Sequence, residues 1–203
     1  MQVAMIDSET ILIYWFGTTP DTAALAKDRA DLWWSKNSEA DREIRERFES
    51  SVQLARESKL NPWLAQPRGR LALIILTDQF PRNIYRDSPR AFGFDATALA
   101  WSLEGIERGH DRLLRPIERV FFYLPLEHSE LLEHQEQSVS MFRELVPIVM
   151  MDQRENFERY LNFAILHRDI VARFGRFPHR NRILGRPSTP DELDFLSQPG
   201  SSF

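Results

Sequence analysis

The chain has 203 residues, a formal net charge of −4, 42% hydrophobic residues and no cysteine. This length and apolar content suit one domain with a sizeable core, and we expect residues 1–203 to form a single all-helical domain. The small net charge and the lack of a basic stripe argue against nucleic acid as a partner. Without cysteine, disulfides, thiolate metal sites and cysteine nucleophiles are excluded, which fits a reducing compartment.

The start of the chain and its hydropathy favour a cytoplasmic protein. Residues 1–10 contain neither a basic segment nor a long apolar run, so no signal peptide is expected. No apolar run approaches the roughly 18 residues that a membrane-spanning helix needs. A membrane partner is therefore not expected.

Capping residues and apolar periodicity predict helices along most of the chain. Gly17 and Gly175 mark helix ends, whereas Ser88-Pro89 and Thr189-Pro190 mark helix starts. No alternating run bounded by hairpin turns predicts a strand. The predicted helices cover residues 8–16, 22–35, 38–59, a buried segment from 71, 88–108, 116–124, 127–145, 152–174 and 189–197.

The predicted fold class is therefore all-α, with about eight to ten helices in antiparallel pairs joined by short connections. Ser38 and Asp41 approximate a capping box for the third helix. Pro125 is expected to interrupt the helix that begins at residue 116. Residues 176–203 are predicted to form a loop, a short last helix and a C-terminal tail, and the terminal Phe203 is expected to dock on the body.

The stretch 71–86 places a carboxylate in the core. Residues 71–76 are all apolar and predict a buried helix, and Asp78 continues its apolar stripe. A buried carboxylate costs several kcal/mol unless it is paired and hydrogen-bonded. Arg82, one helical turn later, is the expected partner if the helix continues past Pro81.

A short motif occurs twice in the chain. Phe-Pro-Arg-Asn at residues 80–83 recurs, with an inserted histidine, at residues 177–181. One interpretation is two helix ends that carry arginine because helix C-termini are partly negative. The other is that both motifs face one pocket, where guanidinium groups would bind a small anion or a peptide carboxylate. The candidate ligand-binding residues are Arg82, Asn83, Arg176, His179, Arg180 and Asn181, with Arg86 and Arg186 as further members of an arginine cluster.

His128 and Asp78 are the candidate catalytic residues. If a helix spans residues 127–145, His128 shares its inner face with Gln135. An inward histidine is either a core residue or a general acid/base, with Asp78 or Glu127 to orient it. The same alternatives apply to His167, which lies on another apolar stripe.

No metal site or cofactor is predicted. Glu127, Glu130 and His134 are metal-ligand types at helical spacing, but they match neither a zinc nor a di-iron motif. The chain has no phosphate-binding glycine loop, no dinucleotide fingerprint and no nucleophile elbow. Ser129 follows His128 directly, and adjacent helical residues do not face each other.

Several stretches resemble one known family. They are residues 14–17, 71–83, 121–130, 174–181 with 185–186, and the closing residues 195–203. Together they resemble the hallmarks of a bacterial family catalogued as domain of unknown function 924 (DUF924), in order and over nearly the whole chain. The resemblance implies an all-α fold similar to the tetratricopeptide-like α–α superhelices, and it implies no activity.

Three functional hypotheses stay open. The leading one is a helical protein that binds a small anion or peptide carboxylate in the arginine-, histidine- and asparagine-lined pocket. The second is a hydrolase-like enzyme with His128 as general base. The third is a scaffold that uses the outer face of helix 38–59, with a purely structural polar cluster. A homodimer is expected on the base rate of symmetric oligomers alone.

Overall fold

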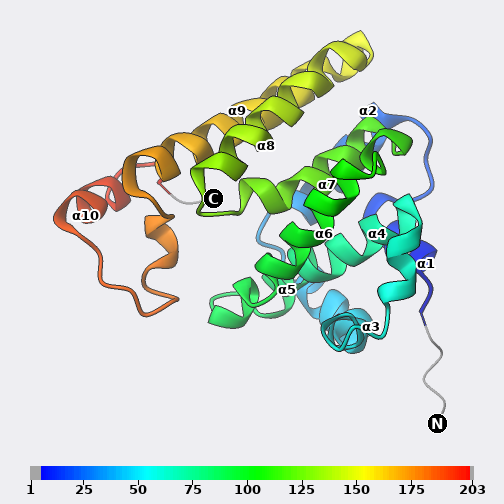
Figure 1. The fold of residues 1–203 in the computed structure, drawn as a ribbon, viewed down its shortest axis with the longest axis horizontal. Helices are drawn as coiled ribbons and strands as arrows, with labels where there is room; N and C mark the ends of the chain where they lie inside the picture. The colour runs from blue at the N-terminus through cyan, green and yellow to red at the C-terminus, as the bar shows by residue number, and fades with distance from the viewer. Residues whose placement is uncertain (1–5, 202–203) are drawn as a thin grey trace.

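The computed structural model describes residues 6–201, and within that range the chain forms helices and loops without a strand (Figure 1). The prediction of an all-α fold is confirmed. The predicted docking of Phe203 lies outside the described residues. The α-helices are α1 (Ser8–Phe16), α2 (Thr22–Trp34), α3 (Ser38–Arg56), α4 (Pro67–Ile74), α5 (Phe80–Ile84), α6 (Asp95–Glu107), α7 (Pro116–Glu127), α8 (Leu132–Leu145), α9 (Met151–Phe174) and α10 (Pro190–Leu196).

Short turns join several of these helices. A π-helical turn, Ile75–Gln79, connects α4 to α5 without a break. The 3₁₀ turns are Asn61–Ala65, Pro89–Phe92, Asp111–Leu113, Val146–Ile148 and Pro178–Arg180.

Local capping accounts for several predicted helix ends. The Asp7 carboxylate accepts a hydrogen bond of 2.7 Å from the Thr10 amide and begins α1. The capping box of α10 is present, because Glu192 accepts from the Thr189 amide at 2.7 Å and Thr189 accepts from the Glu192 amide at 3.3 Å. Gly175 ends α9 in the left-handed conformation, with φ of 69°.

The predicted capping box of α3 is wrong. Asn37 caps this helix by accepting hydrogen bonds from the Glu39 and Ala40 amides. Asp41 instead turns its carboxylate toward Arg86, with an N–O distance of 2.7 Å. The long-range ion pair therefore takes the carboxylate that the local motif would have used.

The predicted helix 88–108 is two elements. Ser88 does act as a cap, but only for the 3₁₀ turn that ends at Gly93. α6 begins separately at Asp95, with Phe94 as its N-cap residue at φ −117° and ψ 0°.

The boundary between α7 and α8 also differs from the prediction. α7 runs through Pro125 to Glu127, so this proline does not interrupt it. α8 begins only at Leu132, and His128 is the C-cap of α7. The predicted helical face shared by His128 and Gln135 therefore does not exist.

The buried stretch at residues 71–76 forms the centre of the molecule. All six side chains have zero exposure, and α4 packs against α1, α6 and α7 (Figure 1). Trp15 and Phe16 of α1 meet the ring of Phe121 on α7 edge-on, with centroids 5.6 and 5.4 Å apart. The apolar run therefore forms the core, as its uniform composition predicted.

A buried arginine explains one glycine of α6. Arg70 is 1% exposed and donates to the Trp101 carbonyl at 2.8 Å and to Glu104 at 3.0 Å. A Cβ atom on Gly105 would lie 2.6 Å from Cδ of Arg70 and would collide with the Phe122 ring. Only glycine at position 105 therefore leaves room for the Arg70 side chain to pack against α6.

In the C-terminal third of the chain, α8 and α9 pack on this core through Val139, Phe142 and Phe157. α8 and α9 form a long antiparallel hairpin whose far end extends beyond the other helices (Figure 1). Residues 175–201 fold back at the other end of α9 and bury a separate apolar cluster around Ile170, Val171 and Phe177. Among residues 6–201, no helix is both long enough and apolar enough to cross a bilayer.

Candidate functional site

Asp78 is the most buried member of the predicted site. It lies in the π turn, its exposure is zero, and it accepts a 2.5 Å hydrogen bond from the Gln79 side chain. A π turn inserts one extra residue into a helix and is frequent at functional sites. Here it turns an acidic side chain into the core at the point where α4 meets α5.

His128 meets Asp78 directly. Nδ1 of His128 lies 2.7 Å from Oδ1 of Asp78, and the imidazole side chain is 15% exposed. An ionised carboxylate only accepts hydrogen bonds, so Nδ1 carries the hydrogen and Nε2 is left as an acceptor. A carboxylate that orients a histidine in this way is typical of acid–base sites.

Arg82 is the predicted partner of Asp78, and α5 does persist past Pro81. Nη1 of Arg82 donates to the main-chain carbonyl of Asp78 at 2.7 Å and lies 3.5 Å from its Oδ1 atom. The same guanidinium binds the Asp95 carboxylate through two contacts, at 2.9 and 3.1 Å. Asp95, in the first turn of α6, was not predicted as a site residue.

Arg180 joins the cluster from the second copy of the repeated motif. Its Nη1 atom lies 3.4 Å from Oδ2 of Asp95, so both motif arginines bind one carboxylate. The guanidinium stacks between the rings of Phe92 and Phe177, at 4.8 and 4.6 Å. No partner for its Nε atom occurs among residues 6–201. Burial and the nearby Arg82 lower the pKa of Arg180 to about 10, so it stays cationic at neutral pH.

The charge states of the central pair follow from these contacts. Burial opposes ionisation of Asp78, but Arg82 and His128 outweigh it, and the pKa of Asp78 falls below its usual range. Burial and then Arg82 lower the pKa of His128. At neutral pH the site therefore holds an ionised Asp78 beside a neutral imidazole.

Glu127 faces His167, so it does not orient His128. Oε1 of Glu127 lies 3.2 Å from Nδ1 of His167, which also donates to the Phe163 carbonyl at 2.8 Å. The distance fits an ion pair, but burial and then Asp78 raise the pKa of Glu127 to about 8. Burial lowers the pKa of His167 to about 3. Both groups are therefore neutral at pH 7.

His179 lies beside the cluster, on the segment that carries Arg180. Its ring centroid is 5.5 Å from that of Phe177. Burial and then Arg180 lower the pKa of His179 to about 4, so it too is neutral at pH 7.

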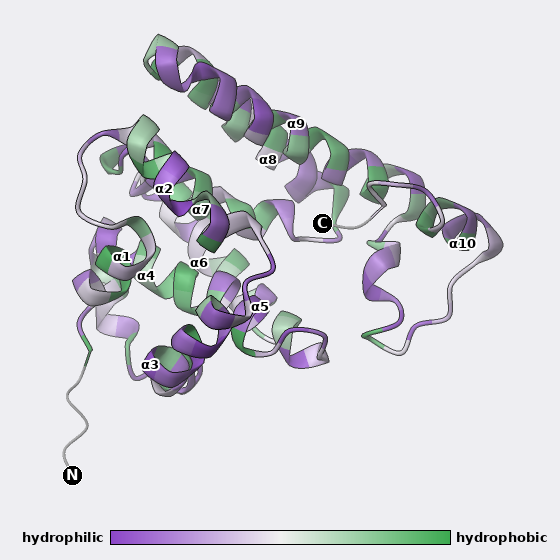
Figure 2. Cartoon of the chain, turned by 180° about the vertical axis from the view of Figure 1, so that it is seen from behind, coloured by the Kyte–Doolittle hydropathy of each residue, from purple (hydrophilic) through white to green (hydrophobic). Residues whose placement is uncertain are grey.

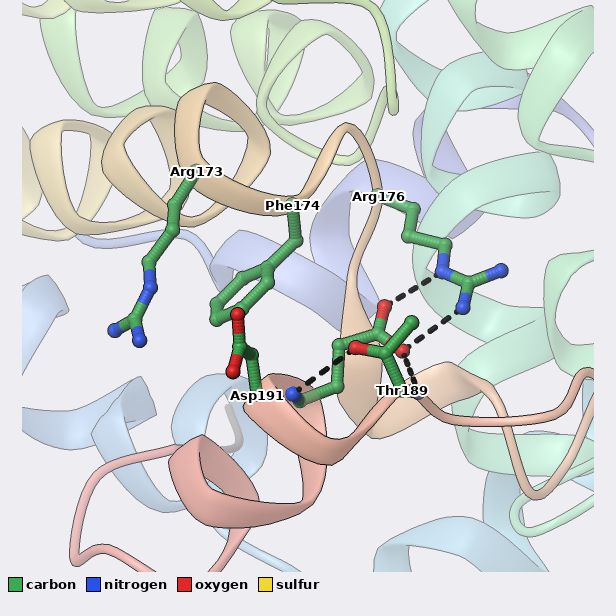
Figure 3. A pocket seen from close by; sticks show the side chains of 6 residues that line it. Arg173, Phe174, Arg176, Thr189 and Asp191 are labelled. Atoms are coloured by element: carbon green, nitrogen blue, oxygen red, sulfur yellow. Dashed lines mark hydrogen bonds and ion pairs between the residues drawn. The ribbon is translucent and has the colours of Figure 1, made fainter.

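Two predicted site residues, Arg176 and Asn181, meet at Glu192. Arg176 forms a bidentate ion pair with this carboxylate at 2.7 and 2.8 Å, and Asn181 donates to it at 3.2 Å. The ion pair lines a pocket of about 410 Å³. Figure 3 shows that Arg173, another lining residue, points away from Arg176. These hydrogen bonds hold the start of α10 in place.

Asn83 faces a different helix from the other candidates. Its side chain donates to Asp41 at 2.8 Å, and Arg86 binds the same carboxylate through two contacts of 2.7 Å. These contacts fasten α5 to α3. The predicted arginine cluster is therefore divided, and only Asp78, Arg82, His128 and Arg180 lie together, with His179 at their edge.

The three side chains that were weighed as metal ligands point in different directions. Glu130 precedes α8 and binds Arg186 at 2.6 and 2.9 Å, while His134 contacts the Ser129 hydroxyl at 2.9 Å. Glu127 faces His167, so the helical spacing does not bring them together. In the described part of the chain, no group of three or more histidine or acidic side chains is arranged to hold a metal ion.

The sequence matches the profile of the family described as "Bacterial protein of unknown function (DUF924)" over residues 11–200. The chain belongs to this family. A solved structure of a protein of unknown function from Agrobacterium tumefaciens shares 38% identity and superposes with a TM-score of 0.73. The match covers 87% of this chain and 98% of that one. No curated protein matches the sequence.

These similarities establish the family and the helical fold of this DUF924 member. They carry no activity, so its function has to be argued from the site itself. The tetratricopeptide-like superhelix, the single-domain organisation and the cytoplasmic location stay predictions.

Proposed function

We propose that this DUF924 protein binds a small anion together with a proton at the site formed by Asp78, Arg82, His128 and Arg180. The observation that carries the proposal is the 2.7 Å contact from Nδ1 of His128 to Asp78, which leaves Nε2 as a proton acceptor. The ligand class is a carboxylate or phosphate, including the carboxylate of a peptide.

The charges of the site support this coupling. Two guanidinium groups, on Arg82 and Arg180, are balanced by the carboxylates of Asp78 and Asp95. The group is therefore neutral while His128 is neutral. Protonation of Nε2 adds one positive charge, which a bound monoanion would compensate. Arg180 supports the same ligand class, because its guanidinium makes a single ion-pair contact among the described residues.

Linkage sets the sign of the pH dependence. An anion near the imidazole stabilises its charged form, so ligand binding raises the pKa of His128. Reciprocally, the affinity for the anion rises as the pH falls toward that pKa. A simple arginine site would bind a fully ionised carboxylate such as acetate with no such dependence, since guanidinium groups stay protonated throughout.

An enzyme is the second candidate, and the orientation of His128 by Asp78 favours it. Nε2 would take a proton from a water molecule that attacks a carbonyl carbon, while a guanidinium stabilises the developing oxyanion. Ser129 would not be the nucleophile, because its hydroxyl contacts His134. The enzyme hypothesis therefore requires water as the nucleophile.

The test is an NMR titration of the histidine ring signals with acetate and with inorganic phosphate at several pH values. We expect the His128 signals to shift and its pKa to rise with either anion. His134→Gln should keep this response, whereas His128→Gln and Arg180→Lys should abolish or weaken it. If the His128 signals do not respond to either anion in the folded protein, the binding proposal is wrong and the cluster is a structural network.

A further inference from the structure

The far end of the α8–α9 hairpin exposes large apolar side chains. We call residues 146–154 the hairpin tip. Ile148, Met150 and Met151 are 54%, 69% and 76% exposed there. Figure 1 shows that the tip extends beyond the rest of the fold, and Figure 2 shows hydrophobic residues at its end. Three exposed large apolar residues within four positions of a protruding tip are characteristic of a contact surface.

Helix capping does not explain these residues. Met150 occupies the N-cap position of α9 and makes no side-chain hydrogen bond to the helix. Aspartate, asparagine or threonine caps α1, α2, α3 and α10. A methionine at this position contributes apolar surface in place of a cap.

A pocket lies on the same hairpin tip. Its volume is about 540 Å³, and its lining residues are Val146, Pro147, Leu161, Arg143, Arg154 and Glu158. The Nε atom of Arg154 is buried and has no hydrogen-bond partner among residues 6–201. Neither Arg143 nor Arg154 forms an ion pair in that range. The pocket therefore combines an apolar wall with guanidinium groups whose N–H donors are available to a partner.

We propose that the hairpin tip is a homodimer contact in which Met151 and Asp152 of one copy enter this pocket on the other. Met151 would cover Val146 and Leu161, and the exposed Asp152 would pair with Arg154. Because the projecting residues and the pocket lie on the same tip, a two-fold axis forms the contact twice. The proposal thereby gives a surface to the homodimer, which the sequence analysis expected only from the general frequency of symmetric oligomers.

The charges of the tip favour a second copy over a lipid surface. The apolar residues could insert into a bilayer, but Asp152, Glu155 and Glu158 are exposed beside them. These carboxylates would face anionic headgroups, which is unfavourable. In the proposed two-fold contact, Asp152 instead meets Arg154 in a pocket that also holds Arg143.

The first test measures mass across a dilution series by sedimentation or light scattering. We expect a concentration-dependent dimer for the unmodified chain and a monomer for Met151→Glu. The matched control is Leu193→Glu, since Leu193 is a 59% exposed leucine on α10 that should leave the dimer intact. A chain that stays monomeric at every concentration overturns the proposal, and so does a dimer that survives Met151→Glu.

The absence of cysteine allows a second test of the geometry. Met151→Cys and Leu161→Cys are made as separate variants and then mixed under mild oxidation. The proposed contact predicts that the mixed disulfide forms faster than either symmetric one. A Leu193→Cys variant, mixed in the same way, should form no preferred disulfide. Equal yields from all pairs would contradict the contact, even if a dimer exists.

Discussion

Nδ1 of His128 lies 2.7 Å from Oδ1 of Asp78, although 50 residues separate them in the chain. The contact joins the C-terminus of α7 to the π turn between α4 and α5. It places a partly exposed imidazole on a fully buried carboxylate.

Removing the charge of Asp78 should destabilise the fold. Asp78→Asn leaves Arg82 without one of its two carboxylates inside the protein, and breaking a buried pair costs roughly 3–5 kcal/mol. The pKa of His128 should fall further, because Asp78 favours the imidazolium form. Urea unfolding and NMR titration measure the two effects. Asp169→Asn, which alters only an exposed ion pair, should change the unfolding free energy by less than about 0.5 kcal/mol.

Glu127 should make stability fall as the pH rises. Its pKa is about 8 in the folded protein and 4.5 in the reference state, so the folded protein binds one more proton between these values. Four histidines act in the opposite direction around and below pH 6.5, because the fold lowers their pKa from this reference value: His110, His128, His167 and His179. The contribution of Glu127, up to about −1.4 kcal/mol per pH unit, is therefore the difference in slope between the unmodified chain and a variant without this carboxyl group.

Glu127→Gln should remove this contribution and leave the opposing contribution of the histidines. The measurement is the free energy of urea unfolding at closely spaced pH values between 6.5 and 8. Glu136→Gln, at an exposed carboxylate on α8, should keep the slope of the unmodified chain. An identical slope in the Glu127→Gln protein would show that Glu127 is ionised in the fold.

Gly105→Ala should destabilise the protein by about 1–3 kcal/mol, because the new methyl group collides with Phe122 and crowds Arg70. Gly93→Ala is the matched control. Its Cβ would lie 3.4 Å from the Arg90 carbonyl, and its φ of −66° suits any residue. Thermal unfolding of the two variants separates the steric effect from the general effect of replacing glycine. Equal unfolding temperatures would contradict the packing described for α6.

Glu130→Ala should loosen the segment after α9. The Glu130 carboxylate binds Arg186 through two contacts and accepts a 2.8 Å hydrogen bond from the Phe177 amide. Without it, amides 176–186 should exchange with solvent several-fold faster, as measured by hydrogen exchange. Glu133→Ala, at an exposed residue on α8, is the control and should leave these amides protected. Unchanged exchange in Glu130→Ala would mean that the apolar cluster around Phe177 holds the segment alone.

Local chemistry allowed much of the helical fold to be predicted. The cap at Asp7, the capping box at Thr189 and the stop at Gly175 act over a few residues, so they are visible in the sequence. The predictions failed where a distant partner competed with a local motif. Asp41 pairs with Arg86 and does not cap α3. Ser88 caps a single 3₁₀ turn, and α6 begins separately at Asp95.

The sequence by itself determined the helical class and the burial of Asp78, because apolar periodicity depends on spacing along one helix. Only the tertiary structure decided which side chains meet. It brought Arg180 to Asp95, 85 residues earlier, and assigned Asp78 to His128 and Glu127 to His167. Every long side chain near a helix end can reach several partners, and the packing of α5, α6, α7 and α9 selects one of them.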